Sequence, residues 1–255
     1  LGTVGIAEAG ANDANNGDDI TLTFTGSETI GTPTCTIKDG AGATMDNSVT
    51  VENTENNIWT CVVETHNDDA DGTVTFSVAY SDSAGNAGSA ETTVDDASSV
   101  TIDNTHPTLS SVSIATAGAG NANDGDVITL SFTSSETIQT SPTCTFSDSA
   151  SAAMDNSGSI TVADGGSNAW TCKITTHNAD PNGAITFSIA FTDSAGNAGT
   201  AVSAVTDSTS VTIDNTHPTL SSISIADAGT GNANNGDDIT LSFTASEGIQ
   251  SPTCT

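Results

Sequence analysis

The sequence predicts an all-β fold: a chain of β-sandwich domains, each about 110 residues long. Two observations predict it. Segments recur at a shift of 111 residues, and apolar residues within each repeat alternate with polar ones. A repeat of this length exceeds the ~20–50 residues of a solenoid unit and suits one sandwich domain. No stretch shows the 3.6-residue period of an amphipathic helix over a useful length.

The repeats are nearly identical in sequence. The heptapeptide TIDNTHP begins at Thr101 and again at Thr212, and residues 101–145 match residues 212–255 at 37 positions with one deletion. We therefore expect the sequence to be a window on a longer tandem array. The predicted domains are 1–103, with its first strand partly missing, 104–214, which is complete, and 215–255, which holds only the first three strands.

The alternation also places the strands. Ile128, Leu130 and Phe132 alternate with Thr129 and Ser131, as expected for a strand with one buried and one solvated face. Clusters of Gly, Asn and Asp separate such runs every 8–12 residues. The seven strands expected in the second repeat cover 109–115, 126–133, 142–148, 158–163, 169–175, 184–192 and 202–213.

Cysteines recur in two contexts, PTCT on the third strand and WTC on the fifth. Cys172 shares its parity with Trp170 and Ile174, so its side chain is expected in the core. A zinc site is disfavoured because each repeat has two thiols and no CxxC spacing. Persistent disulfides indicate an oxidising compartment, so we expect an extracellular or cell-surface protein. The predicted pairs are Cys35–Cys61 and Cys144–Cys172, with the partner of Cys254 outside this sequence.

The charge is strongly one-sided. The chain has 32 acidic residues against two lysines and no arginine, which gives a formal net charge of −30. Contact with nucleic acid or an anionic membrane needs a basic surface, so neither partner is expected. No apolar run approaches ~20 residues, so no transmembrane segment is predicted in this sequence.

The segment FTDSAGNAG at 191–199, leading into VTIDNTHPTLSS at 211–222, resembles the tandem bacterial immunoglobulin-like repeats of large extracellular surface proteins and adhesins. The match covers essentially the whole chain. The resemblance implies Greek-key immunoglobulin-like sandwiches in extended rods on a cell surface, often stiffened by calcium between domains. The chain departs from the pattern in His106 and His217, which precede the linker prolines, and in its cysteine pairs.

Acidic loops are the candidate functional feature. Alternate loops of a sandwich gather at the same pole, so the acidic loops of one repeat face the linker and the next repeat. Carboxylate and carbonyl oxygens converging there suit Ca²⁺, which takes 6–8 oxygen ligands. The alternative is that these are ordinary turn residues and that their charge serves solubility. The candidate ligands are Asp13, Asp18, Asp68, Asp71, Asp103, Glu136, Asp193 and Asn197 at the first junction, and Asp124, Asp126, Asp180, Asp214 and Glu247 at the second.

No catalytic motif occurs in the sequence, so we do not expect an enzyme. The favoured function is a structural repeat segment of a long extracellular fibre, stalk or adhesin shaft. Its partners would be neighbouring repeats of the same chain and copies of itself in a filament. The alternative is a binding or spacer module for cell or glycan adhesion, or one attached to a secreted enzyme. The third repeat would be completed by the continuing chain or by strand addition from another chain.

Overall fold

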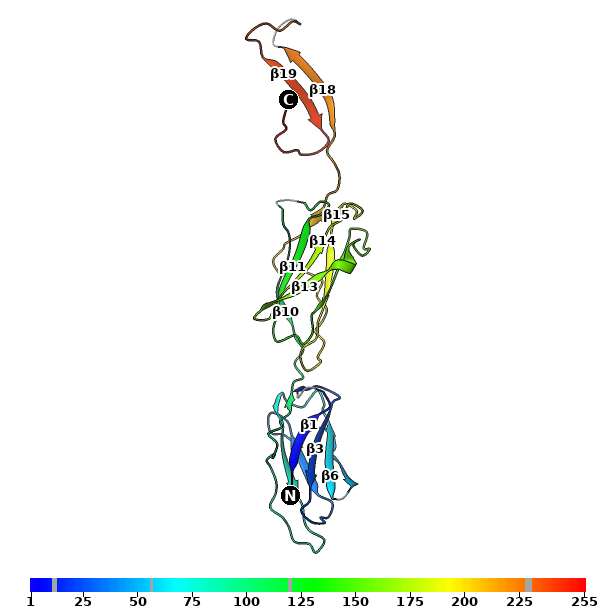
Figure 1. The fold of residues 1–255 in the computed structure, drawn as a ribbon, viewed down its shortest axis with the longest axis vertical. Helices are drawn as coiled ribbons and strands as arrows, with labels where there is room; N and C mark the ends of the chain where they lie inside the picture. Colours follow the sequence, from blue (N-terminus) through cyan, green and yellow to red (C-terminus); the bar gives the residue numbers. More distant parts are fainter. Residues whose placement is uncertain (11–12, 56, 119–120, 228–230) are drawn as a thin grey trace.

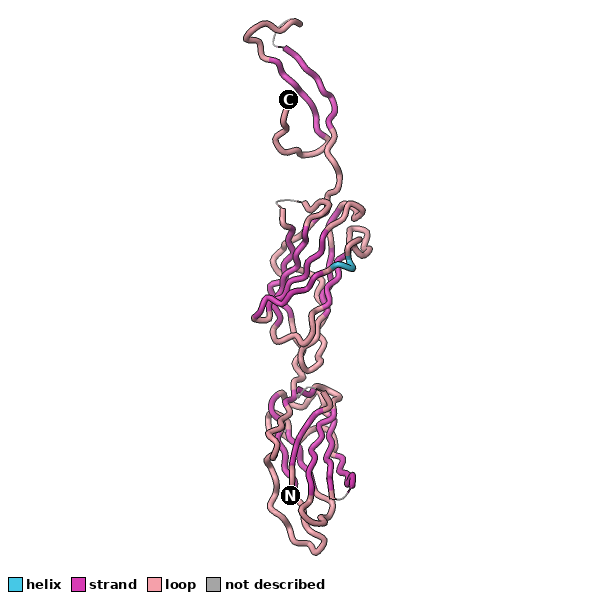
Figure 2. Tube along the Cα trace, in the orientation of Figure 1, coloured by secondary structure: helices cyan, strands magenta, loops and turns pink. Residues whose placement is uncertain are grey.

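The computed structural model describes residues 1–255 except 11–12, 56, 119–120 and 228–230. Three units follow one another along the long axis of the molecule (Figure 1), and strands and loops make up almost all of the chain (Figure 2). The first unit has a hydrophobic core formed by residues between Val4 and Ile102, and the second has a separate core between Val112 and Ile213. In the part of the chain that the structure describes, no helix is long and apolar enough to cross a membrane.

The first unit consists of two facing sheets and a small third one. The larger sheet has the spatial order β1-β3-β6-β5, and β4 pairs with β8 in the sheet opposite. The small sheet pairs β9 in parallel with β2 and antiparallel with β7. The strands are β1 (Val4–Glu8), β2 (Asp13–Ala14), β3 (Asp19–Thr25), β4 (Thr34–Lys38), β5 (Thr50–Glu55), β6 (Ile58–Glu64), β7 (Gly72–Thr73), β8 (Thr75–Ala79) and β9 (Thr101–Ile102).

The second unit repeats this plan. Its larger sheet has the order β10-β11-β14-β13, β12 pairs with β16, and β15 pairs with β17. The elements are β10 (Leu109–Thr116), β11 (Val127–Ser134), β12 (Thr143–Ser147), the 3₁₀ helix η1 (Ser157–Ser159), β13 (Thr161–Gly166), β14 (Ala169–Thr175), β15 (Gly183–Ala184), β16 (Thr186–Ala190) and β17 (Thr212–Ile213).

The strand order identifies the fold. With β1, β3, β4, β5, β6 and β8 read as strands A, B, C, D, E and F, the sheets are A-B-E-D and C-F. An isolated bridge between Val78 and Glu91 adds the last strand beside F, as the bridge between Ile189 and Val202 does in the second unit. This is the arrangement of a constant-type immunoglobulin domain. The prediction of an all-β chain of tandem immunoglobulin-like sandwiches is confirmed.

The last predicted strand, 202–213, is wrong over most of its length. Among the described residues it pairs with its neighbours at Val202, at the Val211 carbonyl and at β17, and between Val202 and Val211 the chain crosses to β10. There the Thr206 backbone N–H donates to the Val112 carbonyl at 2.8 Å, and the Thr209 hydroxyl accepts from the Ile114 N–H at 2.9 Å. The crossing satisfies backbone groups on the edge of β10 that a straight last strand would leave unpaired. The fourth predicted strand, 158–163, begins later because η1 occupies its start.

The core follows the predicted parity. Ile128 and Leu130 on β11 have no exposed surface, and Cys172 faces them from β14. Both predicted disulfides are present, Cys35–Cys61 between β4 and β6 and Cys144–Cys172 between β12 and β14. Because β4 and β12 belong to one sheet and β6 and β14 to the other, each disulfide ties the two sheets of its unit together.

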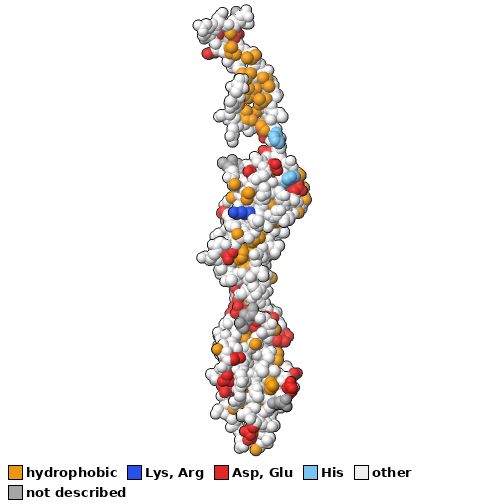
Figure 3. Space-filling view, viewed as in Figure 1, with side chains coloured by type: hydrophobic (Ala, Val, Ile, Leu, Met, Phe, Trp, Pro, Cys, Tyr) orange, Lys and Arg blue, Asp and Glu red, His pale blue; other side chains and the backbone are white. Residues whose placement is uncertain are grey.

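The third unit is a hairpin of β18 (Leu220–Asp227) and β19 (Ile239–Ala245). Its register repeats that of β10 and β11, since Ile225 lies opposite Leu241 as Ile114 lies opposite Leu130. No second sheet covers this hairpin in the described residues, and its apolar side chains form the exposed hydrophobic band on the upper unit in Figure 3.

We predict that replacing Cys144 and Cys172 together by alanine lowers the free energy of unfolding of the second unit by about 3–4 kcal/mol. The disulfide closes a loop with a sequence separation of 28 residues, and removing it restores the chain entropy of the unfolded state by about that amount. Urea denaturation followed by tryptophan fluorescence measures the change. Cys254→Ala is the control and should leave the midpoint unchanged, and a loss below about 1 kcal/mol in the double variant would contradict the prediction.

Candidate metal centre between the first and second units

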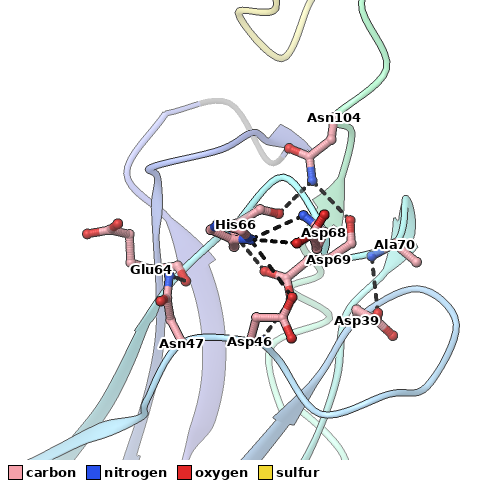
Figure 4. Close-up of polar contacts among 9 residues, drawn as sticks. All are labelled: Asp39, Asp46, Asn47, Glu64, His66, Asp68, Asp69, Ala70 and Asn104. Carbon is pink, nitrogen blue, oxygen red and sulfur yellow. Dashed lines mark hydrogen bonds and ion pairs between the residues drawn. The ribbon is translucent and has the colours of Figure 1, made fainter.

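Two buried aspartates organise the end of the first unit that faces the second. Asp39 accepts backbone N–H groups from Ala41, Ala43 and, across to the next loop, Ala70, at 2.8–3.1 Å. Asp69 accepts from the His66 N–H at 2.7 Å and the Asp46 N–H at 3.0 Å (Figure 4). The Ala70 N–H is the main cause that lowers the pKa of Asp39. These carboxylates replace missing backbone partners in the loops and so fix the shape of this pole.

The second unit uses the same device at the equivalent positions. Asp148 accepts from Ala150 and Ala152, and Asp180 accepts from the His177 N–H at 2.8 Å. Asp180, a predicted calcium ligand, is buried, and its carboxylate is hydrogen-bonded within its own unit. Two other predicted ligands also brace a turn: Asp18 accepts from the Asn15 N–H at 3.0 Å, and Asp126 accepts from the Asn123 N–H at 2.9 Å.

The turn at residues 193–197 forms the facing end of the second unit. The Asp193 carboxylate accepts the backbone N–H groups of Gly196 and Asn197, both at 2.8 Å, and the Asn197 side-chain amide at 2.9 Å. Asp193 has no exposed surface and Asn197 only 6 %, and the first unit makes the equivalent Asn86–Asp82 bonds in its own exposed turn. The turn is thus a preformed element and needs no rearrangement to make contact.

Three hydrogen bonds join this turn to the first unit and the linker. Asn197 Nδ2 donates to the Asp103 carbonyl at 2.7 Å, and Asn15 Nδ2 donates to the Ala195 carbonyl at 2.7 Å. His106 Nδ1 hydrogen-bonds to the carbonyl oxygen of Ala198 at 3.0 Å. The sequence singled out Asn197 but not Asn15, whose only signal is the recurrence of N-x-G-D in every repeat.

Three carboxylates, one from the linker and two from the second unit, meet beside these bonds. Asp103 from the linker and Glu136 and Asp193 from the second unit have oxygens that all lie within 4.8 Å of one another. Partial burial is the main cause that raises the pKa of Asp103, and the neighbouring charges of Asp193, Asp71 and Asp13 raise it further. Burial, followed by the charges of Asp103, Asp193 and Asp71, likewise raises the pKa of Glu136.

The structure therefore brings five of the eight ligands predicted for the first junction into one electrostatic group: Asp13, Asp71, Asp103, Glu136 and Asp193. Asn197 joins them through its bonds to Asp103 and Asp193. All donors in the group are oxygens, the chemistry that a hard divalent cation such as Ca²⁺ prefers. The chain's two lysines, Lys38 and Lys173, lie on the exposed faces of their strands.

Asp68 belongs to a different cluster. His66 Nδ1 lies 3.6 Å from a carboxylate oxygen of Asp68 and 3.8 Å from one of Asp46, on the surface of the first unit. In the second unit His177 lies 3.4 Å from Asp155, and Ala179 follows two residues later in place of the second acid.

The calcium ligands predicted for the second junction form no comparably close group among the described residues. Asp124 and Asp214 line the same cavity of about 500 Å³, together with the linker residues 215–218. Asp214 accepts from the side-chain amide of Asn182 at 3.2 Å, and Asn182 occupies the position of Asp71 in the first unit. Glu247 has a buried carboxylate oxygen with no hydrogen-bond partner among the described residues.

Comparison with known proteins adds likenesses of fold at low similarity. No family model matches the chain, and no curated protein matches it. A titin I-band fragment, I67–I69, is similar with a TM-score of 0.41 and 12% identity, over 84% of this chain and 65% of that one. A mutated variant of the same three titin domains gives 0.42 and 10%, over 97% and 76%. A tetra-tandem repeat from the extending region of a large adhesion protein gives 0.36 and 15%, over 96% and 63%. The assignment of the fold above depends on the strand order and not on these scores.

We predict that Asn197→Ala destabilises the second unit by about 1–3 kcal/mol, because it leaves the Asp103 carbonyl without its hydrogen bond and removes the side-chain donor to one oxygen of the nearly buried Asp193 carboxylate. Asn86→Ala is the matched control. Asn86 makes the same bond to Asp82 in the exposed turn of the first unit, at 2.7 Å, but contacts no other unit. Urea denaturation of both variants measures the difference, and equal effects would contradict a role for Asn197 between the units.

We also predict that, without divalent ions, lowering the pH from 7 to about 5 strengthens the contact between the units. Asp103 and Glu136 have pKa values raised above their ordinary 3.8 and 4.5 when the units are docked. Their charged forms therefore oppose docking at neutral pH, and this penalty shrinks as the pH falls toward the raised pKa values. Thermal unfolding in EDTA across this range measures the effect. Glu136→Gln should reduce the pH dependence, and a contact that weakens between pH 7 and 5 would contradict the prediction.

Proposed function

We propose that this chain is a structural segment of a long extracellular rod, such as a fibre, stalk or adhesin shaft, whose units are held in line by Ca²⁺ bound between them. The observation that carries the proposal is the group formed by Asp103, Glu136 and Asp193, which spans the linker and the second unit next to acids of the first. Asp103, Glu136 and Asp193, with Asn197 beside them, would hold the cation, which supplies positive charge and no reaction.

Electrostatics supports a cation at this place. Two unit charges 4 Å apart interact by about 4 kcal/mol at the effective dielectric constant typical of sites near a protein surface. Three carboxylates at such separations repel one another, and burial increases the cost of each charge. A divalent ion reverses the sign of these interactions, so the same residues that oppose docking without it favour docking with it.

The remaining architecture suits a load-bearing rod. The units lie in line (Figure 1), short linkers containing Pro107 and Pro218 connect them, and each complete unit has a disulfide across its sheets. Disulfides of this kind persist outside the cell, which supports an extracellular location. Trp59 is buried in its core and Trp170 packs partly buried against the other, so neither is a fully exposed ring for a sugar, and a structural role is favoured over glycan binding.

The test of this proposal is calcium titration of the whole chain. At a calcium concentration one hundred times the Kd, binding at the junction should stabilise the docked state by about 2.7 kcal/mol. Small-angle X-ray scattering should give a larger maximum dimension in Ca²⁺ than in EGTA, with fewer bent conformations. The melting temperature should also be higher in Ca²⁺. Unchanged dimensions together with unchanged melting would contradict the proposal.

Glu136→Gln and Glu28→Gln make a matched pair for this experiment. Glu28 occupies the position of Glu136 in the first repeat, but its carbonyl accepts from the Asn57 side chain beside the start of β6, at the pole opposite the Asp39 and Asp69 loops. We expect Glu136→Gln to weaken calcium binding at least tenfold in isothermal titration calorimetry because it removes one ligand charge from the group. Glu28→Gln should leave this binding unchanged, and equal losses in the two variants would place the ion elsewhere.

A further inference from the structure

A histidine and two aspartates come together on the surface of the first unit. His66 and Asp68 lie in the loop between β6 and β7, and Asp46 lies in the loop between β4 and β5 (Figure 4). One imidazole nitrogen and one carboxylate oxygen from each aspartate all lie within 4.8 Å of one another. Two separate loops thus direct one nitrogen donor and two oxygen donors at the same point.

The imidazole nitrogen in this group carries a lone pair and not a proton. His66 Nδ1 accepts the backbone N–H of Asp68 at 3.3 Å, and an imidazole nitrogen that accepts a hydrogen bond is unprotonated. Its distances to the carboxylate oxygens, 3.6 Å to Asp68 and 3.8 Å to Asp46, also exceed the ~2.7–3.2 Å of an N–H···O bond. Three electron-pair donors therefore face one another with no proton between them, and a cation at this point would stabilise all three.

The separations suit a tetrahedral transition-metal ion. With Zn–N bonds of about 2.0–2.1 Å and Zn–O bonds of about 2.0–2.2 Å, tetrahedral coordination places a ligand nitrogen and a ligand oxygen about 3.4 Å apart. Both carboxylates are exposed, so rotation of their side chains closes the difference. An imidazole ligand selects ions such as Zn²⁺, Ni²⁺ or Cu²⁺ over Ca²⁺, which takes oxygen donors. Three protein ligands leave the fourth position open to water.

A buried carboxylate holds the two ligand loops in position. Asp69 is 4 % exposed, and it accepts the backbone N–H of Asp46 on one oxygen at 3.0 Å and that of His66 on the other at 2.7 Å. The Asn104 side-chain amide of the linker donates to the His66 and Asp69 carbonyls, both at 3.0 Å. The backbones of two ligand residues are therefore fixed before a metal binds, so that binding costs little ordering.

The second unit has the same scaffold but lacks one ligand. Asp180 accepts the backbone N–H groups of Asp155 and His177 at 3.0 and 2.8 Å, and His177 Nδ1 lies 3.4 Å from a carboxylate oxygen of Asp155. Ala179 stands where the first unit has Asp68, and its N–H donates to His177 Nδ1 at 3.2 Å. The two units therefore form a natural pair in which one side chain distinguishes three donors from two.

We propose that His66, Asp46 and Asp68 form a site for a divalent transition-metal ion such as Zn²⁺ on the first unit, and that Ala179 removes this site from the second. The ion joins the two loops beside the point where Asn104 attaches the linker. The site shares no ligand with the group formed by Asp103, Glu136 and Asp193, so the inference does not rest on the proposed function.

Isothermal titration calorimetry of the whole chain with ZnCl₂ tests the proposal. The buffer contains excess CaCl₂, which keeps oxygen-only sites occupied, and the chain carries Cys254→Ser, because a free thiol would compete for zinc. We expect one saturable zinc site per chain. Asp68→Ala, which gives the first unit the side chain of the second, should weaken binding at least tenfold. No saturable zinc binding, or binding that Asp68→Ala leaves unchanged, would overturn the proposal.

Ala179→Asp is the reciprocal variant. It supplies the missing carboxylate on the scaffold that Asp180 already holds, so the number of zinc sites per chain should rise from one to two. Ala179 is exposed, so the added carboxylate does not enter the core. A stoichiometry that stays at one would contradict the assignment of the three ligands.

Nitrogen-15 NMR of the imidazole rings identifies the ligand atom. One equivalent of zinc should shift the His66 Nδ1 resonance and leave those of His106, His177 and His217 in place. A shift at another histidine with none at His66 would overturn the proposal.

Discussion

Negative charge without cationic partners is the constraint on which the rest of this structure depends. A chain with 32 acidic residues and two lysines must place its carboxylates where something other than a basic side chain receives them. Within each unit that role falls to backbone N–H groups, which hold Asp39, Asp69, Asp148 and Asp180 in the loops. Two or three N–H donors offset the free-energy cost of burying a charged carboxylate. The acidic loops are in this respect part of the scaffold.

Between the units, backbone N–H groups do not satisfy all of the carboxylates. Asp193 is satisfied by its own turn, but Asp103 and Glu136 lie against it, and burial together with the charge of Asp193 raises the pKa of both. The hydrogen bonds of Asn15, Asn197 and His106 orient the two units and leave this repulsion in place. Proton uptake or a bound cation can remove it, and only the cation does so at neutral pH. In the extracellular rod that we propose, a junction of this kind would link stiffness to the ions around it.

Sequence patterns were sufficient for the features that depend on local periodicity. The recurring PTCT and WTC contexts, with the inward parity of Cys172, predicted both disulfides. The 111-residue repeat and the alternation predicted tandem sandwiches, and the resemblance of residues 191–199 and 211–222 added the immunoglobulin-like type. The last strand was wrong because the crossing near Thr206 and Thr209 serves the edge of β10, about 95 residues earlier in the chain. No local pattern encodes such a partner.

The candidate site was also predicted only in part. Sandwich topology was sufficient to bring Asp103, Glu136 and Asp193 to one junction. It could not separate them from Asp18 and Asp180, which have the same composition around them but use their carboxylates inside their own loops. The contact of Asn15 with Ala195 joins residues 180 positions apart and was invisible to the sequence.

A crystal structure of the chain grown in CaCl₂ would show whether a calcium ion neutralises the junction. We expect anomalous density for one ion between the first and second units, with oxygens of Asp103, Glu136 and Asp193 among 6–8 ligands at about 2.3–2.6 Å. A junction with the three carboxylates still in contact, bridged only by water or protons at neutral pH, would contradict it.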